Sequence, residues 1–350
     1  MSNALSRPVL LPQAIRPDRP LPDAQCIELG GETMGTCWSV KVSAPPGAFD
    51  AHTVQQALQA CLHEVCAQMS HWDADSALMR FNRAEAGSWH TLAPHFQRVM
   101  RCALEAARLS GGACDPGAGH WVQRWGFGGV ARHDQPGFVV PDEAELLGLA
   151  EGHPHGWQDL RWGPDGAQLL QPGGVQLDLG AIAKGFAVDL LSEALSARGF
   201  THHLVEIGGE LRGEGMKPDG QPWWVALELP SALSRDADEG RFDAPVLALH
   251  GLAVATSGDY RKGFVSPDGR WLSHTIDPRV GRPVRHGLAS VSVVHPQCMW
   301  ADAWSTALSV LGLDEGLDLA DRLRLPAFFV SRQGDDLVPY ASAQFEAMLG

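Results

Sequence analysis

The sequence predicts an α+β fold, in which helices and strands follow one another in irregular order. Four long segments repeat apolar residues at the spacing of an amphipathic helix, and shorter apolar runs bounded by glycine are typical of strands. The two kinds of segment do not alternate regularly, as they would in a parallel sheet with helical crossovers. Apolar residues form 45% and charged residues 19% of the 350 residues, which is typical of a globular protein rather than a disordered one.

The first third of the chain predicts an arm, a strand pair and two helices. Residues 1–25 are rich in proline and aperiodic, so we expect an extended N-terminal arm before one folded domain over 26–350. Residues 27–42 alternate loosely around the turn-like Met34-Gly35-Thr36, which predicts two adjacent strands. Two helices are expected, from the candidate N-cap Asp50 to Met69 and from Phe96 to Ala107, the second ending at Gly111-Gly112.

The remaining two thirds predict further helices and strands. Residues 128–175 are rich in Gly, Pro and Trp and predict short strands at most. Helices are expected over 181–198 and 300–311, each followed by a glycine, and the polar segment 231–241 is typical of a surface insertion. Apolar runs predict strands over 203–207, 223–229, 246–255, 272–276 and 289–295. A short helix and a strand are expected at the end of the chain.

The charge balance limits the partners of the protein. With 27 Lys and Arg against 41 Asp and Glu, the formal net charge is −14, which argues against a nucleic-acid partner. Any anionic ligand must therefore be held by backbone N–H groups, a metal ion or a few local cations.

Cysteine usage and the lack of long apolar segments predict a cytoplasmic protein. The seven cysteines include no C-x-x-C pair, which is typical of small buried side chains in a reducing compartment. No apolar stretch approaches the roughly 20 residues of a membrane span. Neither a signal peptide nor a lipoprotein anchor is evident before Cys26.

Several segments combine glycine with carboxylate or hydroxyl groups, as ligand-binding loops do. After a helix end, Asp115 follows a glycine pair and can accept from a bound group, although the same residues suit a helix cap. Asp178 precedes a predicted helix whose first N–H groups can meet an anion, with Lys184 one turn further, but Asp178 is also a normal cap. His274 follows the hydroxyl-rich Ala255–Tyr260 segment and is either catalytic or structural.

Asp302 and Thr306 form the candidate metal site. They are four residues apart in a predicted helix, so both oxygens project from one face. Oxygen ligands of this kind suit Mg²⁺, with phosphate completing its coordination. The alternative is that Asp302 has a purely structural role, as a hydrogen-bonded carboxylate near the start of a helix. The sequence has no zinc-ligand spacing, no G-x-S-x-G, no P-loop and no dinucleotide-binding fingerprint. The residues alone therefore suggest that a polyphosphate ester binds through Mg²⁺.

The order of these segments resembles the ApbE-type FAD:protein FMN transferase family. The resemblance covers roughly residues 30–312 and implies an ApbE/T-fold-like α+β fold with mostly antiparallel sheets and packed helices. The matching segments are Met34–Thr36, Met69–Ser76, Gly112–Asp115, Trp125–Gly128, Leu177–Asp189, Ile207–Gly209, Ala255–Tyr260, His274–Pro283 and Ala301–Thr306.

The resemblance implies an enzyme that cleaves the pyrophosphate of FAD with Mg²⁺. FMN passes to a Ser or Thr hydroxyl of an acceptor flavoprotein through a phosphoester bond, and AMP is released. The family pattern assigns Mg²⁺ to Asp302, Thr306 and the backbone carbonyl of Ala181, and makes His274 the general base. By the same pattern, the residues expected to contact FAD are Met34, Trp72, Ala113, Cys114, Asp115, Asp178, Lys184, Thr256 and Ile276.

Departures from the family pattern leave the metal ligands intact. Trp72 replaces Tyr, Cys114 replaces Phe, and Gly117 stands where Thr is usual. Glu206 and Glu210 replace Asn and Asp around Gly208-Gly209, and Val280 replaces Thr. Two alternatives stay open: an Mg²⁺-dependent FAD pyrophosphatase that uses water as acceptor, and a non-catalytic FAD-binding protein.

Overall fold

The computed structural model describes residues 8–12, 18–129, 132–152, 156–230, 243–260, 262–334 and 336–350. The surface insertion predicted at 231–241 lies outside these ranges. The chain forms two compact units, one from residues 1–61, 184–258 and 287–350 and the other from residues 62–183 and 259–286. The domain boundary expected at residue 26 stays a prediction.

An eight-stranded sheet forms the centre of the first unit. Its strand order is β17-β16-β15-β10-β7-β6-β3-β2, and every neighbouring pair is antiparallel. The strands are β2 (Gln25–Thr33), β3 (Thr36–Ala44), β6 (His203–Ile207), β7 (Glu210–Glu214), β10 (Leu252–Gly258), β15 (Leu288–His295), β16 (Ala327–Gln333) and β17 (Asp336–Ala341).

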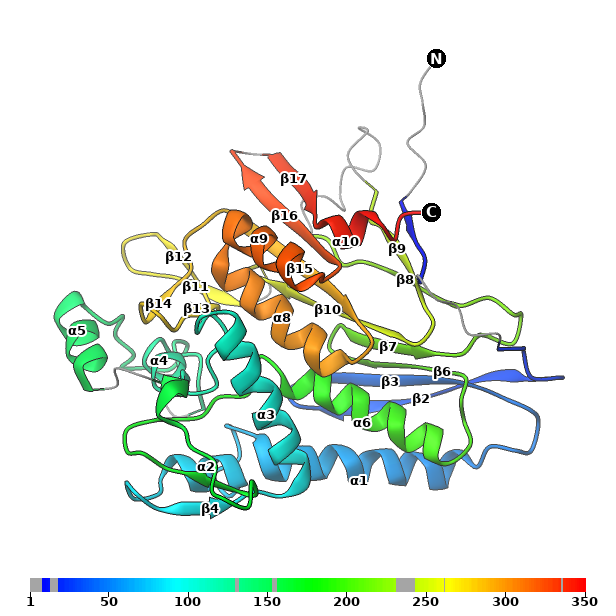
Figure 1. Ribbon diagram of the computed structural model, residues 1–350, viewed down its shortest axis with the longest axis horizontal. Coiled ribbons are helices and arrows are strands. Elements are labelled where there is room, and N and C mark those ends of the chain that lie inside the picture. Colours follow the sequence, from blue (N-terminus) through cyan, green and yellow to red (C-terminus); the bar gives the residue numbers. More distant parts are fainter. Residues whose placement is uncertain are drawn as a thin grey trace. The chain divides into compact units, whose positions relative to one another are not determined.

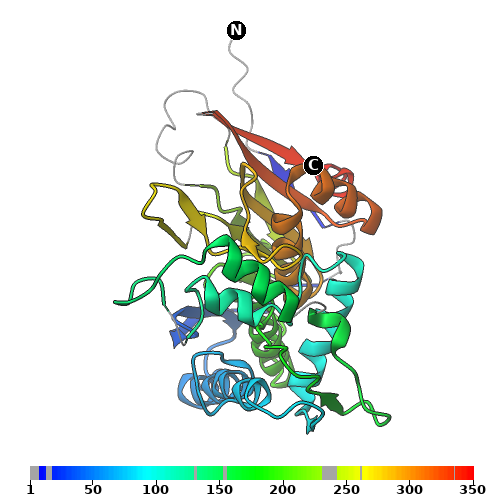
Figure 2. The same ribbon diagram turned by 90° about the vertical axis from the view of Figure 1, so that its left-hand side faces the viewer.

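Helices cover one face of this sheet (Figure 1). They are α6 (Ala183–Ala197), α8 (Cys298–Leu311) and α9 (Leu313–Leu323). Figure 2 shows α8 and α9, in orange, beside the orange and red strands β15–β17. Alternate residues of β10 and β15, such as Ala253, Ala255, Val291 and Val293, are fully buried, as expected of strands covered by helices.

A smaller sheet belongs to the other face of the first unit. It contains β1 (Val9–Leu10), β9 (Val246–Leu249) and β8 (Trp223–Ala226) in that order, and β1 runs parallel to β9. Leu10 from the predicted arm is fully buried in an apolar cluster with residues of both sheets, among them Leu247, Val254 and Val294. The short helix α10 (Ala343–Glu346) adds Phe345 to the same cluster.

The second unit is mainly helical, with short strand pairs. The division of the chain falls within α1 (Ala51–Met69), whose N-cap Asp50 accepts hydrogen bonds from the backbone of His52 and the hydroxyl of Thr53. The helices are α2 (Ala77–Asn82), α3 (Pro94–Leu109), α4 (Gly119–Arg124), α5 (Glu143–Gly152) and the 3₁₀ helix η1 (Gly156–Asp159). Strand pairs are β4 (Trp89–Thr91) with β5 (Gln168–Leu170), β11 (Gly263–Val265) with β12 (Trp271–Ser273), and β13 (Ile276–Asp277) with β14 (Arg282–Pro283).

The α+β prediction is confirmed, with three local corrections. The run 272–276 is not one strand but is divided between β12 and β13, which pair with different strands. The expectation of short strands at most over 128–175 is wrong, because α5 lies there, with Asp142 accepting from the N–H of Glu145 at its start. The apolar run 246–255 is not one strand but the end-to-end pair β9 and β10, which belong to different sheets. Gly251, with φ of +71°, makes the turn between them, and a continuous apolar run conceals such a turn.

None of the helices in the described ranges is long and apolar enough to cross a membrane.

Candidate functional site

Four side chains that carry oxygen lie where α8 faces β10 in the first unit. We call Asp302, Ser305, Thr306 and Ser257 the oxygen cluster. Asp302 is 4% exposed, and its Oδ2 accepts a hydrogen bond of 2.9 Å from the backbone N–H of Gly185. Thr306 lies one turn further along α8. The hydroxyl of Ser257 lies 3.2 Å from Thr306 Oγ1 and 2.8 Å from Ser305 Oγ. The helix therefore places Asp302 and Thr306 on one face, as their spacing predicts.

This donor set fits a magnesium ion. Within the described ranges, no cluster of three or more His, Cys, Asp or Glu residues is arranged to hold a metal. A metal at α8 would consequently depend on one carboxylate, hydroxyl groups and backbone carbonyls, which are hard oxygen ligands of the kind that Mg²⁺ takes. Burying the charge of Asp302 is unfavourable unless hydrogen bonds or a cation balance it.

Lys184, in the first turn of α6, forms an ion pair with Glu210 on β7. Glu210 is 2% exposed on its side chain, whereas Lys184 keeps 30% of its side chain accessible. An ammonium group has three N–H donors, so a lysine paired in this way can also donate to a phosphate. The ion pair involves a position where this sequence departs from the family pattern, since Glu210 replaces Asp.

Met34 occupies a strained turn between β2 and β3. Met34 and Gly35 both have positive φ, of 50° and 71°, which is the geometry of a type I′ hairpin turn. A methionine in the left-handed region costs roughly 1–3 kcal/mol, and such strain is concentrated at functional sites. Thr36, which follows Gly35, lies close to the Gly208-Gly209 turn between β6 and β7. A Cβ atom added at Gly208 would be only 2.9 Å from the Thr36 methyl group.

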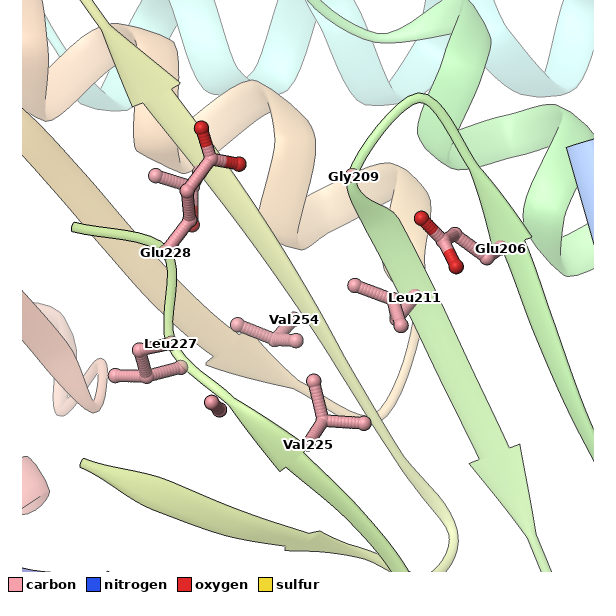
Figure 3. Close-up of a pocket in the computed structure, with 9 residues that line it drawn as sticks. Glu206, Gly209, Leu211, Val225, Leu227, Glu228 and Val254 are labelled. Atoms are coloured by element: carbon pink, nitrogen blue, oxygen red, sulfur yellow. The ribbon is translucent and has the colours of Figure 1, made fainter. Parts of the chain in front are cut away.

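Thr256 faces away from the oxygen cluster. Adjacent strand residues point to opposite faces, and Ser257 is the one that contacts α8. Thr256 instead bonds Ser292 at 2.8 Å and lines a pocket of about 240 Å³. Figure 3 shows Leu211 and Val254 in this pocket, with the carboxylates of two glutamates, Glu206 and Glu228, above them. The structure therefore separates Thr256 from Asp302 and Thr306.

In the second unit, Asp178 does not cap a helix. Helix α6 begins at Ala183, later than the predicted start at 181, and the Asp178 carboxylate accepts from the N–H of Gly180 at 2.8 Å. The other carboxylate oxygen lies 3.4 Å from Nδ1 of His71. Ala181 belongs to the turn between Asp178 and the helix.

Asp115 is held by backbone donors in a turn built from glycines. The turn follows a Schellman cap, in which the N–H of Gly112 donates to the carbonyl of Ala107, so the cap interpretation of the glycine pair is confirmed. Asp115 Oδ1 accepts from the N–H of Gly117 at 2.7 Å. Burial raises its pKa from 3.8 to about 6, against the opposing effect of these hydrogen bonds. Ala113 and Cys114 beside it are buried.

Trp72 presents an open aromatic face. Its side chain is 56% exposed, and the Arg132 guanidinium lies 5.7 Å from the ring centroid. The loop around it is fixed by Ser70, whose hydroxyl accepts from the N–H groups of Trp72 and Asp73. Such a ring can stack on a planar ligand.

His274 is hydrogen-bonded through one ring nitrogen to a backbone carbonyl. Its Nδ1 lies 2.9 Å from the carbonyl oxygen of Lys262, which can only accept, so Nδ1 carries the proton. Nε2 of the neutral ring is then the acceptor. Phe127 packs against the ring edge at a centroid distance of 6.3 Å. Ile276, two residues on, is buried in an apolar cluster with Trp121 and Leu272.

Sequence reasoning missed four residues around the oxygen cluster: Ser257, Ser305, Gly185 and Glu210. Ser257 and Gly185 lie inside recognised motifs, and strand alternation distinguishes Ser257 from Thr256 once one face of β10 is known. Glu210 stood out only as a departure from the family pattern, and its contact with Lys184, 26 positions earlier, could not be inferred from the sequence.

Residues 34–329 match the model of the ApbE family. FAD:protein FMN transferases from Vibrio cholerae and Haemophilus influenzae are 35% and 34% identical to this chain, over 93% of it and over 93% and 92% of their own lengths. A solved structure of flavin transferase ApbE from Vibrio cholerae has 34% identity, a TM-score of 0.82 and covers 93% of this chain and 100% of that one. The apo flavinyl transferase ApbE of Pseudomonas stutzeri has 34% identity and a TM-score of 0.83, covering 93% and 98%. The chain belongs to the ApbE family.

Proposed function

We propose that this protein is an FAD:protein FMN transferase. It breaks the pyrophosphate of FAD, attaches FMN to a Ser or Thr hydroxyl of an acceptor flavoprotein and releases AMP. The observation that carries the proposal is the 35% identity, over 93% of this chain, to a relative with that activity in its name. Within the first unit, the oxygen cluster on α8 supports the same reaction, and so does the hydrogen bond of His274 within the second unit.

The transfer needs a base for the acceptor hydroxyl. His274 Nε2 takes the hydroxyl proton while the oxygen attacks the phosphorus on the FMN side. A new phosphorus–oxygen bond forms, the bond from that phosphorus to the bridging oxygen breaks, and AMP leaves with the bridging oxygen. The bond from Nδ1 to the Lys262 carbonyl holds the ring in the required tautomer and stabilises the imidazolium that forms.

The metal site is proposed at Asp302 and Thr306, and the family pattern adds the carbonyl of Ala181. Bound Mg²⁺ would offset negative charge on the pyrophosphate during the displacement. The Gly185 N–H restrains one oxygen of Asp302, so the carboxylate is oriented before a cation arrives. The carbonyls and hydroxyls nearby are neutral, which limits the repulsion between the protein and an anionic substrate.

FAD is proposed to bind through residues of both polar and aromatic character. Lys184 supplies a positive charge for phosphate and Trp72 supplies a stacking face. The remaining contacts rest on the family pattern: Met34, Ala113, Cys114, Asp115, Asp178, Thr256 and Ile276.

Intact-mass spectrometry of an acceptor domain tests the proposal. The domain, which carries a Ser/Thr-Gly-Ala-Thr target sequence, is incubated with this protein, FAD and MgCl₂, and AMP is measured in the same samples. We expect the domain to gain the mass of one FMN less one water, with one AMP released per FMN attached. If AMP and free FMN form at full rate without the domain, the protein is an FAD pyrophosphatase rather than a transferase. If FAD binds tightly and no AMP forms, the protein is a non-catalytic FAD-binding protein.

A further inference from the structure

Helix α6 holds helix α8 at two points, and both lie next to the proposed metal ligands. The first is the bond from the Gly185 N–H to Asp302 Oδ2. The second is Asp189, one turn further along α6, which reaches the first turn of α8. Figure 1 shows the start of α6 beside α8.

Asp189 caps α8 from outside that helix. The N-cap residue Gln297 makes no side-chain capping bond, so the first N–H groups of α8 need other acceptors. Asp189 Oδ1 accepts from the N–H of Cys298 and Oδ2 from that of Met299, both at 2.9 Å. A carboxylate at a helix start is also favoured by the helix dipole.

The Asp189 charge is completely buried and compensated. Its exposed fraction is 0%, and Arg212 on β7 donates to Oδ1 at 2.6 Å. Glu214 accepts from the same guanidinium at 2.9 Å. A buried carboxylate with two backbone donors and one cationic donor has a single favourable position, because moving it would leave these groups without partners.

Gly185 allows the two helices to approach this closely. A Cβ atom there would overlap the carbonyl oxygen of Cys298 and lie 2.7 Å from Cβ of Asp302. The spacing is matched on both helices, since Gly185 and Asp189 are four residues apart, as are Cys298 and Asp302. The contacts therefore fix both the distance between the helices and the register in which Asp302 meets α6.

We infer that Asp189 is a positioning residue for the metal site: by holding the first turn of α8 against α6, it sets the position of Asp302 and Thr306. This inference rests on the metal site of the proposed function. Asp189 itself contacts neither metal nor substrate in this inference. Loss of the cap should therefore weaken metal binding and leave kcat at saturating metal unchanged.

The test is a titration of the full-length protein with Mn²⁺, followed by electron paramagnetic resonance, with and without FAD. Mn²⁺ takes the same oxygen ligands as Mg²⁺. Asp189→Asn keeps the size of the side chain but replaces one acceptor oxygen by an NH₂ group. We expect it to weaken Mn²⁺ binding about 10-fold, the lower end of the range for direct partners of metal ligands, because Asp189 acts on Asp302 through the first turn of α8. In turnover assays, its kcat should recover at saturating Mg²⁺, which a general loss of structure would not allow.

Ser192→Ala is the matched control. Ser192 is also buried in α6, and its hydroxyl bonds Nε2 of His203 on β6 rather than α8. This variant should lose stability and keep its Mn²⁺ affinity within twofold. Asp189→Glu, which retains the charge, is the second variant in case Asp189→Asn does not fold, and a lesser weakening is expected.

Two results would overturn the inference, and they differ. Folded Asp189→Asn or Asp189→Glu with the Mn²⁺ affinity of the parent protein would exclude a positioning role while leaving the metal site in place. No Mn²⁺ binding by the parent protein, or equal binding by Asp302→Ala, would instead remove the metal site of the proposed function and the inference with it.

Discussion

The tautomer of His274 is the most informative feature at the scale of single residues. The Lys262 carbonyl can only accept, so the proton of the neutral ring lies on Nδ1, and Nε2 carries the lone pair that the proposed general base requires. A glutamine at this position could imitate the hydrogen bond to the carbonyl, but its amide is not a base at neutral pH.

His274→Gln should therefore lower kcat for transfer about 10²- to 10⁴-fold, the usual contribution of a general base. The dissociation constant for FAD should change little, and flavin fluorescence quenching measures it. His133→Gln is the control, because His133 stacks on Phe264 in the same unit at 4.6 Å and has no proposed role. Equal losses in the two variants, or full activity of His274→Gln, would contradict the assignment.

Asp115 gives the fold a pH dependence. Burial raises its pKa from 3.8 to about 6, so the folded protein favours the protonated carboxyl. This contribution to stability is present below about pH 4 and is lost as the pH rises through 6. Relative to the parent protein, Asp115→Asn should gain up to about 3 kcal/mol between pH 4 and 7. Urea unfolding across this range measures the gain.

Asp134→Asn provides a control of opposite sign for that experiment. The Arg132 hydrogen bond lowers the pKa of the exposed Asp134, so its contribution is lost as the pH falls rather than as it rises. A constant stability difference between Asp115→Asn and the parent across the pH range would show that burial does not govern Asp115.

At the scale of elements, a short helix organises the Trp72 loop. Ser76, which is fully buried, caps α2 by accepting from the N–H of Met79 at 3.0 Å. The same hydroxyl donates to the carbonyl of Ser70 at 2.6 Å, which closes the loop that carries Trp72. One side chain therefore starts the helix and fixes the aromatic residue proposed to stack on the flavin.

Ser76→Ala should destabilise the protein by about 1–2 kcal/mol and raise the KM for FAD several-fold, because the loop loses its closing bond. Ser342→Ala is the comparison: Ser342 is an equally buried N-cap, at α10, and accepts from the N–H of Phe345. It should destabilise to a similar degree with an unchanged KM. Thermal unfolding and initial rates separate the two effects, and an unchanged KM in Ser76→Ala would argue against a role of the loop in FAD binding.

For the whole molecule, the central question is how a chain with a net charge of −14 handles an anionic substrate. In the region of α6 and α8, the first unit gathers neutral hydroxyls and three buried carboxylates. Two of them are paired with cations, Glu210 with the partly accessible Lys184 and Asp189 with Arg212, and the third is Asp302. A divalent cation at Asp302 would make the local charge favourable although the protein as a whole is acidic.

Removing the metal should consequently abolish AMP release, and MgCl₂ or MnCl₂ should restore it. Asp302→Ala should resemble the metal-free parent protein, with at least a hundredfold loss that added Mg²⁺ does not reverse. Asp318→Ala, an exposed carboxylate of α9, should be active in the same assay. Full AMP release in the presence of EDTA would contradict a metal-dependent reaction.

The sequence determined the features that depend on near neighbours along the chain. Helical periodicity located α1, α3, α6 and α8 to within a few residues, and apolar runs located β6 and β15. The motif residues identified the family without reference to any contact. The α5 helix was missed because glycines at 148 and 152 and the surrounding Gly- and Pro-rich sequence weaken the helical signal.

Only the tertiary structure decided which groups meet. Strand alternation puts Ser257 and Thr256 on opposite faces, but the packing of α8 decides that Ser257 joins the oxygen cluster. The ion pair of Lys184 with Glu210 and the cap that Asp189 provides for α8 join residues far apart in sequence. Such contacts arise from the packing of whole helices and strands. Local propensity and residue spacing do not determine which distant elements pack together.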